Sequence, residues 1–378
     1  MTQHIPPQSL SLFDLLARTW ELGTEIRDVR FNVVGSTVAV TLADGALAFL
    51  LVQDGEDPEK RMRTELETGR MTIRPREKPL PVPVRSQEPV AAVGTGLCPV
   101  AQQGFAFVHH EGAEIWRATA RGQLLRIVRA GEGRVTALSA LPDKRGLLVA
   151  RGARMDIMSP ENGITLVSTA LEHAVTRIGL SADAQQIACW GEGQMTVLDA
   201  GDLACVAQIV ADGQVNGLGW SPDGRWIAGG CADKSLLLVD VVQRQADRIV
   251  DFPAPVTTVA FSSKANAMIS SGAFRVVGWQ LPDLPFGAHE GVAVETGKPG
   301  LTLVETVAVH PLRDLCAVGY ANGLVTLCQI GSREEMMLRE GRGDAVTTLA
   351  WSPDGRHLAI GTAEGAASIA TFPKTMFK

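Results

Sequence analysis

The sequence predicts an all-β fold built from repeats of one four-stranded unit, and three observations lead to this prediction. First, WSPDGRWIAGG, which begins at Trp220, and WSPDGRHLAIG, which begins at Trp351, are nearly identical. Second, a looser skeleton, V-x-x-[LVI]-x-apolar followed by a turn and another apolar run, occurs eight times. Third, no helical pattern of about 10 to 15 residues separates the strand-like runs, which disfavours a parallel βαβ architecture.

The spacing of the repeats indicates sheets of similar size. Successive units begin 64, 45, 40, 40, 41, 48 and 42 residues apart, and insertions explain the longer intervals. Repetition at this period is typical of solenoids and propellers. The eight unit starts are Ile26, Val90, Val135, Val175, Val215, Val256, Val304 and Val346.

Turn residues divide each unit into short strands. SPDG at 221–224 and at 352–355 suits a tight turn, because proline presets φ, aspartate bonds its own backbone and glycine accepts a positive φ. Alternating apolar runs between such turns predict antiparallel hairpins. A second turn, with an acidic residue or asparagine before glycine, recurs at Asp44-Gly45, Glu111-Gly112, Glu192-Gly193, Asn322-Gly323 and Glu364-Gly365.

A weaker fourth strand completes each unit, as at Cys205–Val210 and Glu335–Glu340. Four strands per repeat of this length are typical of a β-propeller blade. The sequence therefore predicts eight blades, with seven as the alternative. The last unit ends near Phe372 without room for a fourth strand, so we expect Leu16–Leu22 to supply it and close the ring. Residues Ser9–Ala17 also have helical spacing, which favours a short helix there.

The chain resembles the WD40-repeat family from about Ile26 to Phe372. The WSPDG units and the LLLVD strand that ends at Asp240 carry this resemblance. Two departures are clear: the chain has no Gly-His and no Trp-Asp dipeptide, and Arg117 and Gln280 follow the tryptophans in the expected position. The resemblance implies a WD40-like propeller with an incomplete inter-blade hydrogen-bond network, and a role as a non-enzymatic protein-interaction scaffold.

We expect three parts in the chain. Residues 1–25 form an N-terminal segment that carries the ring-closing strand. Residues 26–372 form a single propeller domain, interrupted by insertions at 53–85 and 281–300. Residues 373–378 form a C-terminal tail.

The insertion at 53–85 is charged in its first half and rich in proline and basic residues in its second. It is predicted to leave the first blade and end in an extended, polyproline-like segment, and RMTIRP, from Arg70, is the expected outer strand of that blade. The insertion is either a solvated loop or a docking arm for a protein partner. A weaker option is that its basic end contacts nucleic acid or membrane. The candidate docking residues are Arg70, Arg74, Arg76, Lys78 and Arg85.

The positions after each unit start are expected at one rim of the propeller. They are polar but mostly small, and their longer side chains are Arg27, Arg177, Asn216 and Glu305. This rim is either a solvated edge or a docking surface for a peptide or protein.

Composition excludes several other classes of protein. A net charge of −6 gives no whole-surface attraction to nucleic acid or anionic membrane, and 5% aromatic residues argue against a base-stacking platform. The N-terminus lacks the basic region of a signal peptide, and the apolar runs are too short to span a bilayer, so we expect a soluble, cytoplasmic protein. The six cysteines form no CxxC pair and are predicted to be free, buried thiols.

Catalytic motifs are not found in the sequence. ETGKPG fails as a P-loop because Gly291 lies six residues before Gly297 and Pro299 replaces the magnesium-binding hydroxyl residue. His109 and His110 are neighbours on a predicted strand and so point to opposite faces. We therefore predict no catalytic, cofactor-binding or metal-binding residues.

The leading hypothesis is a monomeric propeller that binds an unidentified protein partner within a complex, with no cofactor, no nucleic acid and no membrane insertion. It rests on analogy with the family, since a fold does not fix a function. The alternative is a propeller enzyme, a hydrolase or lyase, with a site in the central channel. Two or more carboxylates or histidines around one point in the channel would favour that alternative.

Overall fold

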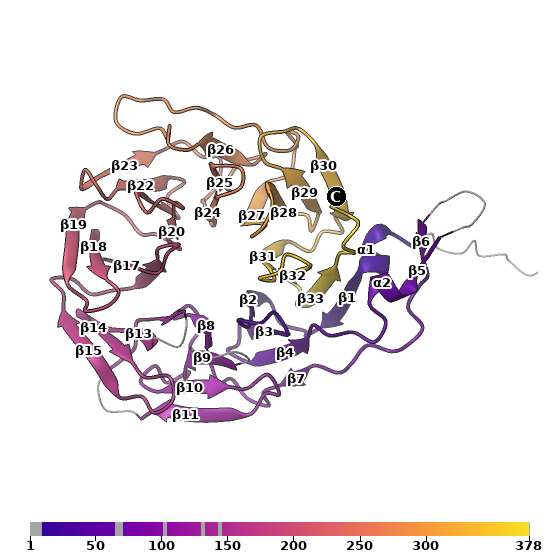
Figure 1. The fold of residues 1–378 in the computed structure, drawn as a ribbon, viewed down its shortest axis with the longest axis horizontal. Helices are drawn as coiled ribbons and strands as arrows, with labels where there is room; N and C mark the ends of the chain where they lie inside the picture. Colours follow the sequence, from indigo (N-terminus) through magenta and orange to yellow (C-terminus); the bar gives the residue numbers. More distant parts are fainter. Residues whose placement is uncertain (1–9, 65–70, 101–103, 130–132, 143–145, 378) are drawn as a thin grey trace, which may run out of the picture.

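The computed structural model describes residues 10–64, 71–100, 104–129, 133–142 and 146–377, and within them eight antiparallel sheets surround a common axis (Figure 1). Seven of these sheets have four strands and one has three. This arrangement confirms the predicted all-β propeller with eight blades, and the seven-bladed alternative is wrong.

Each of the first four blades is a four-stranded meander. Blade 1 contains β2 (Ile26–Phe31), β3 (Thr37–Leu42), β4 (Leu47–Leu51) and β7 (Val84–Arg85). Blade 2 contains β8 (Leu97–Val100), β9 (Gly104–Val108), β10 (Ile115–Ala118) and β11 (Leu124–Val128). Blade 3 contains β12 (Ala137–Leu141), β13 (Gly146–Arg151), β14 (Arg154–Met158) and β15 (Thr165–Ala170). Blade 4 contains β16 (Arg177–Leu180), β17 (Gln186–Gly191), β18 (Gln194–Asp199) and β19 (Cys205–Val210).

The second half of the ring follows the same order. Blade 5 contains β20 (Gly219–Trp220), β21 (Trp226–Gly230), β22 (Leu236–Asp240) and β23 (Gln245–Ile249). Blade 6 contains β24 (Val259–Ser262), β25 (Ala267–Ser270) and β26 (Val277–Gln280). Blade 7 contains β27 (Val304–Val309), β28 (Leu315–Tyr320), β29 (Val325–Gln329) and β30 (Glu335–Arg339). Blade 8 contains β31 (Val346–Trp351), β32 (His357–Thr362), β33 (Ala366–Thr371) and β1 (Ala17–Glu21).

The N-terminal strand closes the ring, as predicted. Strand β1 pairs antiparallel with β33, from Ala17 opposite Ala370 to Glu21 opposite Ala366. The short helix predicted within Ser9–Ala17 is also present in part, as α1 (Leu12–Leu16), which ends directly before β1. Both chain ends thus contribute to one blade, and this pairing covers the edge that β33 would otherwise expose.

The repeated SPDG sequence forms the first turn of a blade. In blade 5 the Ser221 hydroxyl accepts the Trp226 N–H at 2.8 Å and donates to Asp223 at 2.5 Å. The Ser352 turn of blade 8 has the same pair of hydrogen bonds, at 2.9 and 2.6 Å. The glycine that ends each turn has a positive φ, 72° at Gly224 and 70° at Gly355, which explains why glycine recurs there.

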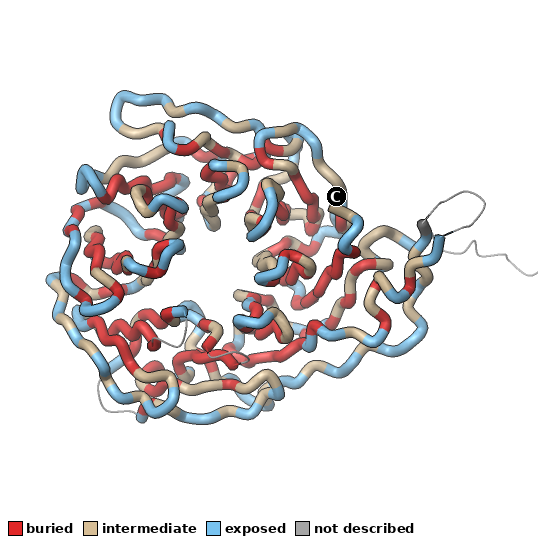
Figure 2. The backbone as a smooth tube through the Cα atoms, viewed as in Figure 1, coloured by how far each residue is buried: buried red, intermediate tan, exposed pale blue. Residues whose placement is uncertain are grey.

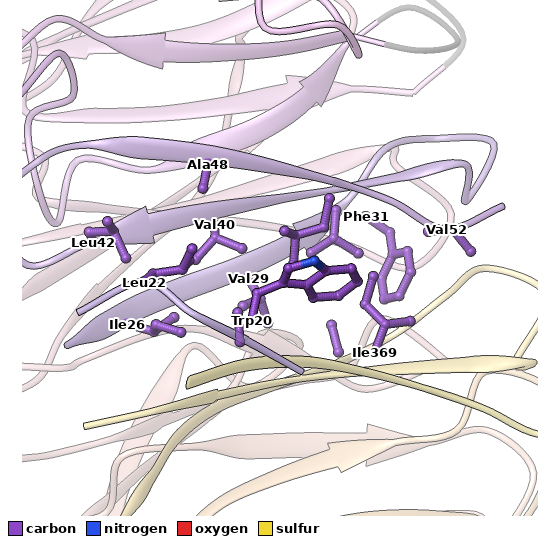
Figure 3. Close-up of a cluster of buried hydrophobic side chains, with 14 of the residues drawn as sticks. Trp20, Leu22, Ile26, Val29, Phe31, Val40, Leu42, Ala48, Val52 and Ile369 are labelled. Carbon is purple, nitrogen blue, oxygen red and sulfur yellow. The ribbon is translucent and has the colours of Figure 1, made fainter. Parts of the chain in front are cut away.

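The hydrophobic core lies between neighbouring blades, and Figure 2 shows buried residues concentrated within the blades. The cluster in Figure 3 joins blade 1 to blade 8, with Trp20 packed among Val29, Phe31, Val40 and Ile369. Trp220 packs in the cluster between blades 4 and 5. Trp351 of blade 8 donates its indole N–H to the Ala308 carbonyl of blade 7 at 3.1 Å. Both tryptophans of the WSPDG units therefore join adjacent sheets.

Three local expectations were wrong. The outer strand of blade 1 is β7, whereas β6 (Met71–Ile73) pairs with β5 (Met62–Thr64) in a separate hairpin after α2 (Pro58–Arg61). The inner strand of blade 2 begins at Leu97 rather than at the unit start Val90, because two positive-φ glycines place a turn between them. Five cysteines are buried free thiols, but the sixth, Cys205, is exposed at the start of an outer strand.

The insertion at 281–300 fills the outer position of blade 6, along the edge of the ring (Figure 1). The Gln280 N–H donates to the Val292 carbonyl, and the Val294 N–H donates to the Gly278 carbonyl, both at 2.8 Å. These bonds cover the edge of β26, so the insertion replaces a fourth strand. Within the described residues, no helix is both long and apolar enough to cross a membrane.

Candidate functional site

We call one of the two faces of the propeller the unit-start face, because the first residue of each repeat lies at that face. Seven of the eight unit-start side chains are buried, with at most 5% of their surface exposed. They pack in the hydrophobic core between neighbouring blades. The next residue is exposed or partly buried in every repeat except the second, where Ala91 is buried. Arg27, Asn216 and Thr257 are exposed there, and Glu305 is partly buried. These polar side chains are therefore at least partly accessible on this face.

Side chains on this face connect successive blades through hydrogen bonds. The Thr136 hydroxyl donates to the Val175 carbonyl at 2.5 Å, and the Asn216 amide donates to the Val256 carbonyl at 3.2 Å. The Thr347 hydroxyl of blade 8 donates to the Ile26 carbonyl of blade 1 at 2.6 Å. In each case the acceptor is the unit-start residue of the next blade.

Two further donors complete this set, which we call the rim belt. Arg177 Nε donates to the Asn216 carbonyl at 3.0 Å, and the Thr257 hydroxyl donates to the Glu305 carbonyl. The rim belt therefore links neighbouring blades at five junctions. Four of its donors directly follow a unit start, and Arg177 lies two residues after one. The recurrence of Thr and Asn after the unit start was visible in the sequence. The carbonyl that each of these side chains binds could not be predicted, because it lies a full repeat away in the chain.

The four predicted rim residues divide into two kinds. Arg177 and Asn216 belong to the rim belt. Arg27 forms an exposed ion pair with Glu25 at 3.0 Å, and its side chain is 53% exposed. Burial raises the pKa of the Glu305 carboxyl above its usual value. Arg27 and Glu305 are the two predicted rim residues whose side chains do not take part in the rim belt.

Thr347→Val is expected to weaken the junction between blades 8 and 1. The substitution keeps the side-chain shape but leaves the Ile26 carbonyl without the hydroxyl donor, so the free energy of unfolding should fall by about 1–3 kcal/mol. Urea denaturation followed by circular dichroism measures this loss. Thr348→Val, at the neighbouring position, is the control. Equal stability of the Thr347 variant and the wild type would show that the rim belt does not stabilise the ring.

The first insertion forms an arm that is clamped to its own propeller. Asp54 accepts two hydrogen bonds from Arg76, at 2.6 and 3.0 Å, and lies 3.6 Å from the Arg18 guanidinium. Arg18 and Asp54 are 4% and 7% exposed. Burial raises the pKa of the Asp54 carboxyl, but the Arg76 and Glu56 hydrogen bonds and the Arg18 charge outweigh it, so the pKa lies below its usual value.

A second carboxylate holds the arm where it turns. Glu56 accepts the N–H groups of Glu77 and Lys78 at 3.0 and 2.7 Å, and it lies 3.6 Å from the Arg74 guanidinium. Arg61 donates to three carbonyls, those of Glu56, Arg74 and Leu15. The arm is therefore tied to the segment that precedes β1.

The candidate docking residues of the arm do not share one role. Arg74 and Arg76 pair with carboxylates of the arm itself. Arg85 donates to the Leu22 carbonyl at 2.9 Å, and Lys78 is exposed. Arg70 lies outside the described residues. The sequence showed the basic residues but not Asp54 and Glu56 as their partners.

The residues considered for catalysis are dispersed. Within the described part of the chain, no group of three or more His, Cys, Asp or Glu side chains is arranged to hold a metal ion. His109 stacks on Trp116, with ring centroids 5.0 Å apart, and the His110 ring lies 4.1 Å from His109. The prediction that the two histidines point to opposite faces was therefore wrong, because His110 lies in a turn and not in a strand. Burial lowers the pKa of His109, as expected for a packed histidine.

Comparison with known proteins agrees with this architecture. A family model described as "WD domain, G-beta repeat" matches residues 204–240, from the outer strand of blade 4 to the end of β22. A model of the anaphase-promoting complex subunit 4 WD40 domain matches residues 307–375, which span most of blades 7 and 8. No curated protein matches the chain.

Two solved structures share the fold. The computationally designed Ika8 protein is 16% identical, with a TM-score of 0.61, and the match covers 93% of this chain and 98% of that one. A chain of the mitotic checkpoint complex is also 16% identical, with a TM-score of 0.56 over 73% of this chain and 86% of that one.

The repeated four-stranded blades, the SPDG turns and the ring closed by an N-terminal strand define an eight-bladed β-propeller. The two family matches, over residues 204–240 and 307–375, together with this architecture support a WD40-repeat propeller.

Proposed function

We propose that the protein is a non-enzymatic, cytoplasmic interaction scaffold that presents its unit-start face to a protein partner. The observation that carries this proposal is the rim belt, which links neighbouring blades at five junctions without using the side chains of Arg27 and Glu305. A preorganised surface binds with little loss of conformational entropy. WD40 propellers are generally scaffolds of this kind, which supports the proposal by analogy.

The arm provides a second surface for the same partner or complex. Its clamp leaves Lys78 and the proline-rich stretch after it exposed, in an extended form that needs little ordering on binding. Six free cysteines are consistent with a reducing compartment such as the cytoplasm. The match to a chain of the mitotic checkpoint complex shows that this fold occurs in multiprotein assemblies.

Arg27→Glu and Glu305→Lys are expected to reduce partner recovery at least about tenfold, because they reverse the charges that the rim presents. Quantitative affinity capture from the native organism measures the loss. Lys264→Glu is the control, since Lys264 is exposed in the β24–β25 turn at the opposite end of the blades. Recovery that falls equally in all three variants, or in none, would contradict docking on the unit-start face.

A further inference from the structure

A small pocket opens on the outer edge of the ring, where blade 1 meets blade 2. Its volume is about 100 Å³, which is the space of about three water molecules at roughly 30 Å³ each. Its lining is almost entirely apolar, and one charged residue, Arg121, stands at its border. The other lining residues are Trp20, Phe49, Leu50, Leu51, Pro81, Val82, Pro83, Val84 and Ala120.

The pocket exists because the outer strand of blade 1 is incomplete. Strand β7 pairs with β4 at only two positions, Ala48 opposite Arg85 and Phe49 opposite Val84. The segment before β7 contains Pro81 and Pro83, which have no N–H to donate to a sheet. The last residues of β4 are therefore left without an outer partner strand.

The walls of the pocket are held in place by contacts elsewhere. The Trp20 indole N–H donates to the Pro81 carbonyl at 2.8 Å, and Leu80 packs on the cluster between blades 1 and 8. On the other side, Gly122 in the β10–β11 turn lies against the Val84 side chain. The pocket is thus preformed rather than opened by a partner.

Its rim exposes apolar surface that the fold itself does not use. Val82 is 89% exposed, Leu51 is 51% exposed and Val84 is 44% exposed. Three such side chains around one apolar pocket are unusual, since single exposed apolar residues are the normal case. Together they suit one branched aliphatic side chain.

The chain around Arg121 is strongly basic, although the whole protein carries a net charge of −6. Residues 115–131 contain four arginines, Arg117, Arg121, Arg126 and Arg129, and no acidic residue. Arg117 donates to the Pro160 carbonyl and Arg126 pairs with Glu114. Arg121 and Arg129 are exposed, and among the described residues neither has an ion pair. Arg121 lines the pocket, whereas Arg129 follows the far end of β11. The charge of Arg121 therefore complements an acidic ligand.

We infer that this pocket binds an extended acidic segment of a protein partner, with one aliphatic side chain in the pocket and carboxylates beside Arg121. The inference rests on the proposed scaffold function and adds a second docking site to it. A nucleic acid would need aromatic faces on which bases stack, whereas the exposed lining consists of valine, leucine and proline, and Trp20 is only 7% exposed.

Fluorescence anisotropy with labelled synthetic peptides tests the site on the full chain. The first probe has a central leucine with glutamates on both sides, the second replaces the leucine by serine, and the third replaces the glutamates by lysines. Only the first is expected to bind saturably. Arg121→Glu and Val82→Glu should each weaken its binding at least about tenfold. Leu301→Ser, which removes a 99% exposed leucine far from the pocket in sequence, should not change it.

Three results would overturn the inference: no saturable binding of the acidic leucine peptide, equal binding of the serine peptide, or displacement of the peptide by single-stranded RNA. Affinity capture with the same variants separates this site from the scaffold function. Partner recovery that depends on Arg27 but not on Arg121, together with no peptide binding, would remove the pocket and leave the scaffold proposal intact. If every variant recovers the partner as well as the wild type does, the scaffold proposal is contradicted instead.

Discussion

Trp20→Ala is expected to lower the free energy of unfolding by about 3–5 kcal/mol, the usual cost of truncating a buried tryptophan. Trp20 lies on the closing strand β1, is 7% exposed and packs in the cluster that joins blades 1 and 8 (Figure 3). Its indole also holds the Pro81 carbonyl. Loss of this one side chain therefore weakens the closure of the ring and the segment that borders the outer pocket.

Equilibrium denaturation followed by far-ultraviolet circular dichroism measures this effect. Glu21→Ala is the matched control, because Glu21 is exposed on the same strand and its truncation should change stability by less than about 0.5 kcal/mol. Trp20→Phe should recover most of the packing but not the hydrogen bond to Pro81. Equal stability of Trp20→Ala and Glu21→Ala would show that β1 does not hold the ring closed.

Asp54→Ala is expected to destabilise the protein by about 3–5 kcal/mol and to release the arm. Removing this carboxylate leaves the Arg18 guanidinium, which is 4% exposed, without its charged partner. It also removes the acceptor of both Arg76 hydrogen bonds. Limited trypsin digestion reports the release, since the Arg76–Glu77 bond becomes accessible when the clamp opens, whereas Arg74 is followed by proline and is not cleaved.

Glu77→Ala is the control for the arm. Glu77 also pairs with an arginine, Arg74, but its side chain is 70% exposed, so its loss should cost no more than about 1 kcal/mol. Denaturation midpoints and digestion rates of the two variants are compared under the same conditions. If Asp54→Ala is as stable and as resistant to trypsin as Glu77→Ala, the arm is not held by its buried carboxylate.

The number and order of the blades could be predicted because each blade carries its own local signals. The Ser221 and Ser352 turns form hydrogen bonds within five residues, so their sequence determines their geometry. Ring closure could also be predicted, since the last repeat was one strand short. The replacement of a fourth strand by the insertion at 281–300 could not, because its residues lack a strand pattern.

The contacts of the candidate surfaces were not visible in the sequence, since they join residues far apart in the chain. Thr347 meets Ile26 only after the ring has closed, and Arg18 meets Asp54 only when the arm folds back. The basic residues alone left a solvated loop and a docking arm both open. Their buried acidic partners show that the charges of Arg74 and Arg76 stabilise the arm itself. Among the described candidates, Lys78 and Arg85 are exposed and form no ion pair.

Hydrogen–deuterium exchange of the full chain, with and without a captured partner, tests the scaffold proposal most directly. The proposal predicts slower exchange on binding in the segments at the unit-start face, around residues 25–28, 215–217 and 304–306. The outer pocket predicts a second protected region around residues 81–84 and 120–126. Protection confined to the opposite end of the blades, around the SPDG turns, or no protection at all, would contradict the proposal.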